Sequence, residues 1–275
     1  MSWDPTDEPD DLAGMGPLNY ALAAVRFVLI AIVVYALMII LFVARLLETP
    51  FGKRPVSPII VQLACRICLF LMRVELVTTG QPMTHDGAVV SNHASWLDIF
   101  TLNAAQKVYF VSKAEVSKWP AIGLVARSTG TVFIERRASQ AKRHKSQFEE
   151  RLLAGERLLF FPEGTSTDSR RVLGFKSTLF EAFFSPKLKE RMWIQPVSLI
   201  YHAPKGEDPR YYGWWGDAPF APHFLKTLGA TSRGRAEIRF HQPVVVQDFK
   251  NRKTLAAHCE AEVRRGLENA IGASA

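Results

Sequence analysis

The sequence has few cysteines and none of the short motifs that mark the common covalent-catalytic and nucleotide-binding enzymes. Its three cysteines are an odd number and do not form a disulfide framework. Cys65 and Cys68 form "CRIC", but their flanks are apolar, which favours buried packing over a redox or zinc site. There is no Gly-x-Ser-x-Gly elbow, no glycine-rich nucleotide fingerprint and no Gly-Lys-Ser/Thr phosphate loop. These absences argue against a disulfide-stabilised protein, an acyl-enzyme hydrolase and a nucleotide-binding enzyme.

Paired metal ligands and internal repeats are also missing. His85, His93 and His144 are scattered along the chain rather than set at metal-ligand spacing. No repeat or low-complexity segment occurs. We therefore expect neither a metal nor a bound cofactor.

The charge is unevenly distributed. The net charge of +8 is compatible with nucleic acid, anionic lipid or an anionic small molecule as partner. The first fourteen residues, however, contain five acids and no Lys or Arg, so residues 1–20 are predicted to form an acidic flexible tail. The basic residues lack the interleaved aromatic platforms of strand-binding proteins, so nucleic acid is not an expected partner.

One long hydrophobic run stands out at residues 27–44, between Arg26 and Arg45. As a helix with a rise of about 1.5 Å per residue it would be roughly 27 Å long, just enough for a bilayer core about 30 Å thick. The preceding segment is acidic and no small-residue cleavage site follows, which favours a membrane segment over a signal peptide. The basic residues after the run predict that the body faces the cytoplasm at the inner membrane.

A second apolar run covers residues 56–76, but Arg66 interrupts it and Arg73 closes it. A charge in mid-span is costly, so a helix on the membrane surface or packed on the body fits better than a second crossing. Together the two runs predict a membrane-associated helical hairpin over residues 21–76.

From residue 77 to residue 275, short apolar runs alternate with helical stretches, as in an α/β domain. Strands are expected at 87–91, 107–113, 130–136, 157–163, 193–201 and 235–246. Helices are expected at 96–105, 119–127, 139–156, 176–188 and 251–272. This alternation predicts a mostly parallel sheet flanked by helices.

The stretch "SNHASWLDIF" places His93 and Asp98 five residues apart. On one helix they would point to different faces, because five residues rotate by about 500°. They can meet if His93 precedes a helix that begins near Ala94 or Ser95. An Asp held against one imidazole nitrogen leaves the other as a proton acceptor. With no Ser or Cys nucleophile in view, such a base would activate a hydroxyl of the substrate. The alternative is a helix start in which both residues only cap and pack.

Two other strand ends carry polar groups. "RLLFFPEGTSTDS" ends in a Pro-Glu-Gly-Thr turn that can line a pocket or present N–H groups to an oxyanion, or form only a tight turn. "GTVFIERR" ends in Arg136 and Arg137, for which we expect an anion ligand and a solvated or lipid-facing residue, respectively.

Four segments in this order resemble the motifs of the bacterial 1-acylglycerol-3-phosphate acyltransferase family, namely Asn92-His93 with Asp98, "GTVFIER", "FPEGTS" and "IQPVSLIY". The match covers about residues 77–205. It implies a glycerolipid acyltransferase-like fold in which His93 deprotonates the free hydroxyl of a lysolipid, with a 1-acylglycerol-3-phosphate-like acceptor as the leading expectation, and Asp98 orients His93. The hydroxyl then attacks the thioester of acyl-CoA or acyl carrier protein, in membrane phospholipid biosynthesis. The implied substrate-binding residues are Arg136, Glu163, Gly164, Thr165, Ser166, Lys113 and Pro196.

One position departs from the family pattern. The third motif commonly has an Arg directly after the Thr, and here that residue is Ser166. Either Arg170, Arg171 or Lys176 replaces the lost phosphate partner, or the acceptor is not a glycerol phosphate. Lyso-ornithine lipid acyltransferases, which resemble this family, illustrate the second possibility.

The remaining alternatives concern the class of protein. A membrane-associated lipid-binding protein would need only the apolar hairpin and the basic charge, and a soluble hydrolase would gain nothing from a membrane segment. Trp214 and Trp215 fit a membrane interface, an acyl channel or simple core packing. Asp217 and His223 receive no role.

Overall fold

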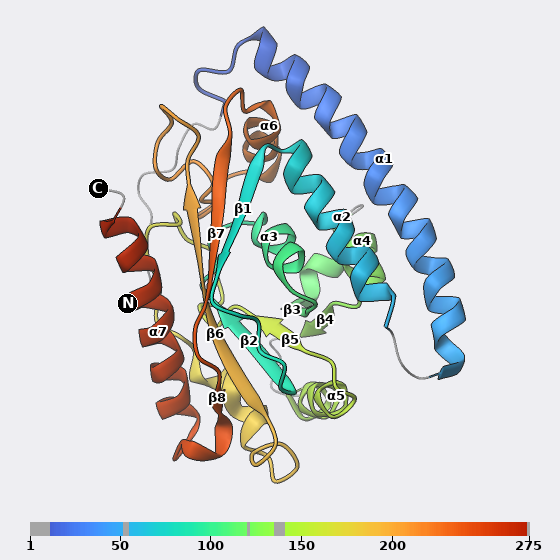
Figure 1. Ribbon diagram of the computed structural model, residues 1–275, viewed down its shortest axis with the longest axis vertical. Helices are drawn as coiled ribbons and strands as arrows, with labels where there is room; N and C mark the ends of the chain where they lie inside the picture. The colour runs from blue at the N-terminus through green and yellow to red at the C-terminus, as the bar shows by residue number, and fades with distance from the viewer. Residues whose placement is uncertain (1–11, 52–54, 120–121, 135–140, 274–275) are drawn as a thin grey trace.

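The computed structural model describes residues 12–51, 55–119, 122–134 and 141–273. Figure 1 shows a layered arrangement, with helix α7 on one side of a twisted sheet and helices α3, α2 and α1 on the other. The sheet has eight strands in the order β1-β7-β6-β2-β5-β3-β4, with β8 paired to β6. The strands are β1 (Val74–Thr79), β2 (Gly87–Ser91), β3 (Tyr109–Lys113), β4 (Val132–Ile134), β5 (Leu158–Phe160), β6 (Trp193–His202), β7 (Gly234–Phe240) and β8 (Val244–Val245).

Most strand pairs are parallel, as predicted. Among the described strands, only the β6–β7 and β6–β8 pairs are antiparallel. The pairs β1–β7, β2–β5, β2–β6, β3–β4 and β3–β5 are all parallel. The carboxyl ends of β2, β5 and β6 therefore lie at one edge of the sheet, where open α/β sheets place their functional residues.

The helices follow the predicted alternation with two exceptions. They are α1 (Pro17–Glu48), α2 (Ser57–Leu71), α3 (Asp98–Ala105), α4 (Ile122–Ser128), α5 (Ala141–Leu153), α6 (Phe220–Gly229) and α7 (Arg252–Gly272), with 3₁₀ segments η1 (Thr49–Phe51), η2 (Ala114–Lys118), η4 (Ser177–Phe184) and η5 (Val246–Asp248). The expected helix at 176–188 is the 3₁₀ segment η4. Helix α6 was not predicted.

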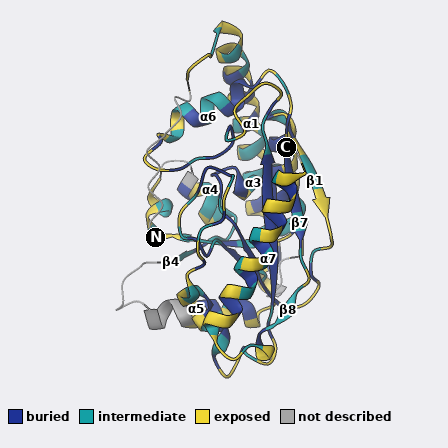
Figure 2. Cartoon of the chain, turned by 90° about the vertical axis from the view of Figure 1, so that its left-hand side faces the viewer, coloured by how far each residue is buried: buried dark blue, intermediate teal, exposed yellow. Residues whose placement is uncertain are grey.

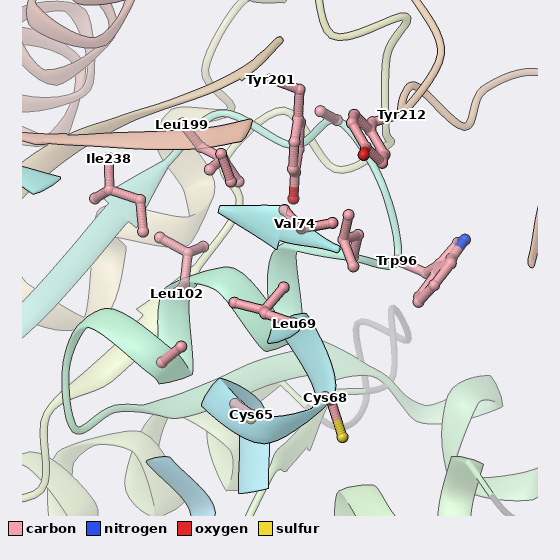
Figure 3. Close-up of a cluster of buried hydrophobic side chains, with 14 of the residues drawn as sticks. Cys65, Cys68, Leu69, Val74, Trp96, Leu102, Leu199, Tyr201, Tyr212 and Ile238 are labelled. Carbon is pink, nitrogen blue, oxygen red and sulfur yellow. The ribbon is translucent and has the colours of Figure 1, made fainter. Parts of the chain in front are cut away.

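Two hydrophobic cores lie on opposite faces of the sheet. One packs residues of α5, η4 and α7 against it, and Figure 2 shows buried positions along α7. The other lies between the sheet and helices α1, α2, α3 and α6. Figure 3 shows part of it, with Cys65 and Leu69 of α2 beside Leu102 of α3. Cys65 and Cys68 are buried and unpaired, and burial raises the pKa of the Cys68 thiol to about 12. The prediction of buried packing cysteines is confirmed.

The N-terminal hairpin consists of α1 and α2, which run side by side (Figure 1). Helix α1 has 32 residues and is long and apolar enough to cross a membrane. Helix α2 packs on the body, where the Arg66 Nε donates to the Ala104 carbonyl of α3 at 2.9 Å. Helix α1 begins at Pro17, inside the expected tail, and β1 begins at Val74, inside the expected hairpin segment.

Both ends of α1 are fixed by polar contacts. Near its start, Arg26 Nη1 donates to the carbonyls of Leu228 and Ala230 at 2.6 and 2.7 Å, which caps the end of α6. At its end, the Glu48 carboxylate accepts the backbone N–H of Val56 and Ser57 at 2.6 and 3.0 Å, at the start of α2. An acidic group at a helix N-terminus is stabilising, so Glu48 sets how the chain turns between the two helices.

Candidate active site

The site begins where the chain leaves β2. Asn92 follows this strand and is fully buried. Its side-chain amide donates to the Leu199 carbonyl and accepts from the Leu199 N–H, both at 2.8 Å. These two hydrogen bonds to β6 fix the backbone just before His93. The imidazole is therefore held by a rigid segment at the carboxyl edge of the sheet.

The His93 ring and the Asp98 carboxylate meet, as the sequence predicted. His93 precedes α3, Asp98 is its first residue, and the distance from Nδ1 to Oδ2 is 2.7 Å. Oδ2 also accepts the N–H groups of Ala94 and Ser95 at 2.8 and 3.1 Å. An ionised carboxylate can only accept, so Nδ1 of the neutral ring carries the proton and Nε2 carries the lone pair.

The exposures of the two side chains suit this arrangement. The Asp98 side chain is 0% exposed, whereas that of His93 is 23% exposed. The carboxylate is therefore shielded while the ring reaches the surface. The ring also stacks on Phe161, which directly follows β5, with centroids 4.1 Å apart and planes 9° apart. The imidazole is thus fixed by a bond on one nitrogen and by an aromatic face.

The Pro-Glu-Gly-Thr turn is bonded to the backbone of His93. The Glu163 carboxyl accepts the His93 N–H at 2.7 Å and the Leu173 N–H at 2.6 Å. Thr167 N–H donates back to the His93 carbonyl at 2.9 Å. Gly164 has a φ of +75°, a conformation that favours glycine. Glu163 is buried, and its hydrogen bond to the His93 N–H holds the backbone that carries the imidazole.

Glu163 gives the protein an expected pH dependence of stability. Burial raises its pKa from 4.5 to about 8, against the two N–H bonds, which lower it. Between these values the folded protein keeps a proton that the unfolded chain has lost, so stability is full below about pH 4.5 and falls as the pH rises through 8. At about 1.4 kcal/mol per pH unit the loss is on the order of 5 kcal/mol. Thermal melting across this range should show a steep decline for wild type.

The matched variants isolate this carboxyl. Glu163→Gln has no titrating group at that position, so its melting temperature should change much less between acid and alkaline pH. Glu190→Gln, at an exposed position, should keep the wild-type slope. Equal slopes for wild type and Glu163→Gln would contradict the assignment.

The other predicted substrate-binding residues are placed as follows. Gly164, Thr165 and Ser166 form the turn beside His93, with Thr165 exposed. Lys113 is exposed at the end of β3, two strands from β2 in the sheet order. Pro196 is buried within β6 opposite Val90, inside the sheet. Arg136 lies outside the described residues.

The cations that the sequence offered as substitutes for the missing arginine differ in their surroundings. Arg171 is held by Asp168, whose carboxylate accepts from its Nε and Nη2 at 2.7–3.1 Å. The same carboxylate accepts the backbone N–H of Arg170 at 3.0 Å. Lys176 is exposed, and its backbone N–H donates to the Pro162 carbonyl. Arg171 is therefore already engaged in an ion pair.

A candidate site residue that the sequence did not single out is Tyr201, near the end of β6. Its hydroxyl donates to Asp98 Oδ1 at 2.9 Å and lies 3.2 Å from Thr101 Oγ1. Burial holds the pKa of this phenol well above its usual value, so it stays a donor. The segment "IQPVSLIY" had been noticed, but only the register of β6 against β2 shows which residue reaches Asp98.

We expect Tyr201→Phe to lower kcat/KM for the reaction of this site about tenfold, the rate equivalent of about 1.4 kcal/mol. The variant leaves Asp98 Oδ1 buried without a donor and its negative charge more concentrated on the His93 side. The acidic limb of the pH–rate profile should therefore move to higher pH. Tyr211→Phe, whose hydroxyl bonds the Lys226 carbonyl instead, is the matched control. A pH profile unchanged by Tyr201→Phe would contradict this role.

Aromatic side chains from residues 211–229 cover one side of the site. Trp96, between His93 and Asp98, donates from Nε1 to His223 Nδ1 at 2.9 Å. Burial lowers the pKa of His223 to about 3, so it is a neutral acceptor with a packing role. The backbone N–H of Trp214 donates to the Ala94 carbonyl at 2.8 Å, and the Trp215 side chain is buried. Core packing accounts for Trp215.

Within the described ranges, no group of three or more His, Cys, Asp or Glu side chains is placed to hold a metal ion. The groups that reach the surface at this site are an imidazole with one oriented acceptor nitrogen and a glycine-containing turn beside it. This arrangement can remove a proton from a hydroxyl presented to Nε2.

Comparison with known proteins shows the family of the chain. The family model described as "Acyltransferase" matches residues 74–200, which include the His–Asp pair and the Pro-Glu-Gly-Thr turn. The chain is similar to a lyso-ornithine lipid O-acyltransferase of Rhodobacter capsulatus, with 51% identity over 265 residues, 96% of this chain and 94% of that protein. It is similar to the enzyme of the same name from Brucella abortus, with 36% identity over 75% of this chain and 80% of that protein.

A 1-acyl-sn-glycerol-3-phosphate acyltransferase of Neisseria meningitidis serogroup B is 32% identical over 43% of this chain and 46% of that protein. The fold resembles the crystal structure of the acyltransferase PlsC from Thermotoga maritima, with a TM-score of 0.65 and 20% identity over 91% of this chain and 95% of that one. The family model and the similarity over nearly the whole chain define an acyltransferase, and the fold is consistent with that class. The chain belongs to the acyltransferase family that contains these lysolipid-acylating enzymes.

Proposed function

We propose that the protein transfers an acyl chain from a thioester, acyl-CoA or acyl carrier protein, to the free hydroxyl of lyso-ornithine lipid. His93 Nε2 takes the hydroxyl proton, and the oxygen attacks the thioester carbonyl. The carbon–sulfur bond then breaks, the ester forms, and the leaving thiolate takes up the proton that His93 holds. The observation that carries this proposal is the His93–Asp98 contact of 2.7 Å, with the carboxylate buried and the ring partly exposed.

The acceptor is inferred from the turn beside His93. Ser166 cannot form the bidentate phosphate contact of an arginine, and Arg171 is engaged by Asp168. Similarity over nearly the whole chain to an enzyme named for lyso-ornithine lipid supports an amino-acid head group. The second candidate acceptor is 1-acylglycerol-3-phosphate, the leading acceptor in the sequence analysis. It is favoured by the partial match to Neisseria and by the nearby cations Arg170 and Lys176.

The proposed location is the inner membrane with the body on the cytoplasmic side. Helix α1 supports membrane association, since it carries large exposed apolar side chains along most of its length. The basic residues that follow the apolar run support the orientation.

The test uses full-length protein in detergent, labelled acyl donor, and the two acceptors in parallel. Faster transfer to lyso-ornithine lipid than to 1-acylglycerol-3-phosphate is the expected result. Preference for the glycerol phosphate would overturn the acceptor and keep the chemistry. Transfer to neither acceptor from either donor would overturn both.

A further inference from the structure

A cavity of about 460 Å³ lies away from the His93 site, between the end of α2, the start of β1, the end of α3 and the residue before β7. Its charged lining residues are Arg66, Arg73, Glu75 and Arg233. Ala104 and Ala105, at the C-terminal end of α3, form part of its wall, whereas Asp98 begins that helix. Asp98 and Ala105 are seven residues apart, so at about 1.5 Å per residue the two sites are separated by about 10 Å along α3. None of the lining residues belongs to the His–Asp network.

The charges around this cavity are unbalanced. Three guanidinium groups share it with one carboxylate, and within the described chain none of the three arginines forms an ion pair. Arg66 is already fixed, because its Nε donates to the Ala104 carbonyl. Arg73 directly precedes Val74 of β1, and Arg233 directly precedes Gly234 of β7. Val74 and Gly234 are paired in register in these parallel strands, so the two arginines are neighbours. Like charges at neighbouring positions repel, which an anion between them would relieve.

The backbone at Arg73 adds a second observation. Arg73 has a φ of +58°, a left-handed conformation that costs energy for any residue except glycine. Its carbonyl accepts the Gly234 N–H at 3.1 Å, which ties the turn after α2 to the start of β7. A strained backbone that places a charged side chain in a cavity is typical of a functional position.

The surroundings of the cavity indicate where its ligand comes from. Phe70, at the cavity, is 73% exposed and continues an apolar row on α2 formed by Ile59 and Leu63, each 49% exposed. Ile59, Leu63, Arg66 and Phe70 follow one another at spacings of four, three and four residues, so they lie on one helix face. An apolar stripe ending in a basic cavity matches a lipid, with acyl chains along the stripe and an anionic head group in the cavity.

We propose that this cavity, the arginine pocket (Arg66, Arg73, Glu75 and Arg233), binds the phosphate of an anionic membrane phospholipid. Guanidinium groups match phosphate oxygens in shape and charge, and Glu75 leaves the site a net positive charge. The bound lipid is not the acyl acceptor. It holds α2 and the first strand of the body against an anionic bilayer and so orients the enzyme on its membrane.

The test is native mass spectrometry of the full chain in detergent, titrated with phosphatidylglycerol or with phosphatidylcholine of the same acyl chains. The test variant is Arg73→Gln/Arg233→Gln, and Arg233→Gln alone serves if the double variant is unstable. The control Lys187→Gln/Arg191→Gln removes the same charge from an exposed turn distant in sequence from the pocket. The readout is lipid binding, so it is independent of acyl transfer.

We expect phosphatidylglycerol to bind more tightly than phosphatidylcholine, and the pocket variant to bind it about tenfold more weakly than wild type and control. Equal weakening by the control variant would show that only net charge matters and would overturn the pocket. Equal binding of the two lipids would do the same. Competition by inorganic phosphate, without preference for phosphatidylglycerol, would show a phosphate site and overturn the lipid assignment.

Discussion

Replacing His93 by Ala is expected to reduce kcat/KM for acyl transfer by about 10²–10⁴-fold, the usual contribution of a general base. Neither of the carboxyl groups described as hydrogen-bonded to His93 can substitute as the base, because Glu163 is buried beneath the turn and Asp98 is 0% exposed. Asp98→Asn should also cause a large loss, since an amide can donate to the ring and favour the tautomer with its proton on Nε2. The measurement is initial rates with labelled acyl donor and lyso-ornithine lipid.

The matched control for this prediction is His258→Ala. His258 lies on α7, on the opposite face of the sheet from α3, and contacts Phe249. It should leave the rate unchanged. His93→Ala should also melt close to wild type, because the ring is partly exposed and only its stacking on Phe161 and one hydrogen bond are lost. Transfer that persists in folded His93→Ala and Asp98→Asn proteins would show that the base lies elsewhere.

The second large effect concerns the head group. Ser166→Arg places a guanidinium directly after the Pro-Glu-Gly-Thr turn, where a phosphate can accept two charged hydrogen bonds. We expect the ratio of kcat/KM for 1-acylglycerol-3-phosphate over lyso-ornithine lipid to rise by about 10- to 100-fold, equivalent to about 1.4–2.7 kcal/mol. The two acceptors should be assayed in parallel with the same donor.

Ser146→Arg adds the same charge at an exposed position on α5 and should leave the ratio unchanged. A rise with both variants would mean that general charge attracts the phosphate acceptor. An unchanged ratio with Ser166→Arg would mean that this turn does not contact the head group, and the inference drawn from Ser166 would fail.

The features that could be predicted from the sequence depend on local pattern. The His93–Asp98 contact was predicted because both residues belong to one strand–turn–helix segment, whose geometry follows from chain direction alone. The mostly parallel sheet was predicted because apolar runs alternate with helical stretches along the chain, which is also a local pattern. Helix α1 followed from a single uncharged run. Helix α2 was expected to lie on the membrane surface or pack on the body, because Arg66 interrupts the apolar run, and the bond from Arg66 to α3 shows that it packs on the body.

What could not be predicted depends on contacts between distant segments. Tyr201 reaches Asp98 across 103 residues, and Glu163 reaches the His93 N–H across 70. Such contacts require the register of β2 against β5 and β6. Strand β1 was missed because it follows α2 after a turn of only two residues and half of it is exposed. Helix α6 was missed because Pro219 and Pro222 read as loop residues, although proline is tolerated in a first turn.

The contact between Arg26 and the end of α6 has a mechanical consequence. Arg26 joins the long N-terminal helix to α6, His223 joins α6 to Trp96, and Trp96 stands between the base and its orienting acid. On the proposed function, these contacts would set the height of the His93 imidazole relative to a membrane that holds α1. An acceptor hydroxyl would have to reach that height to react, so α1 would fix substrate depth as well as attach the enzyme to the membrane.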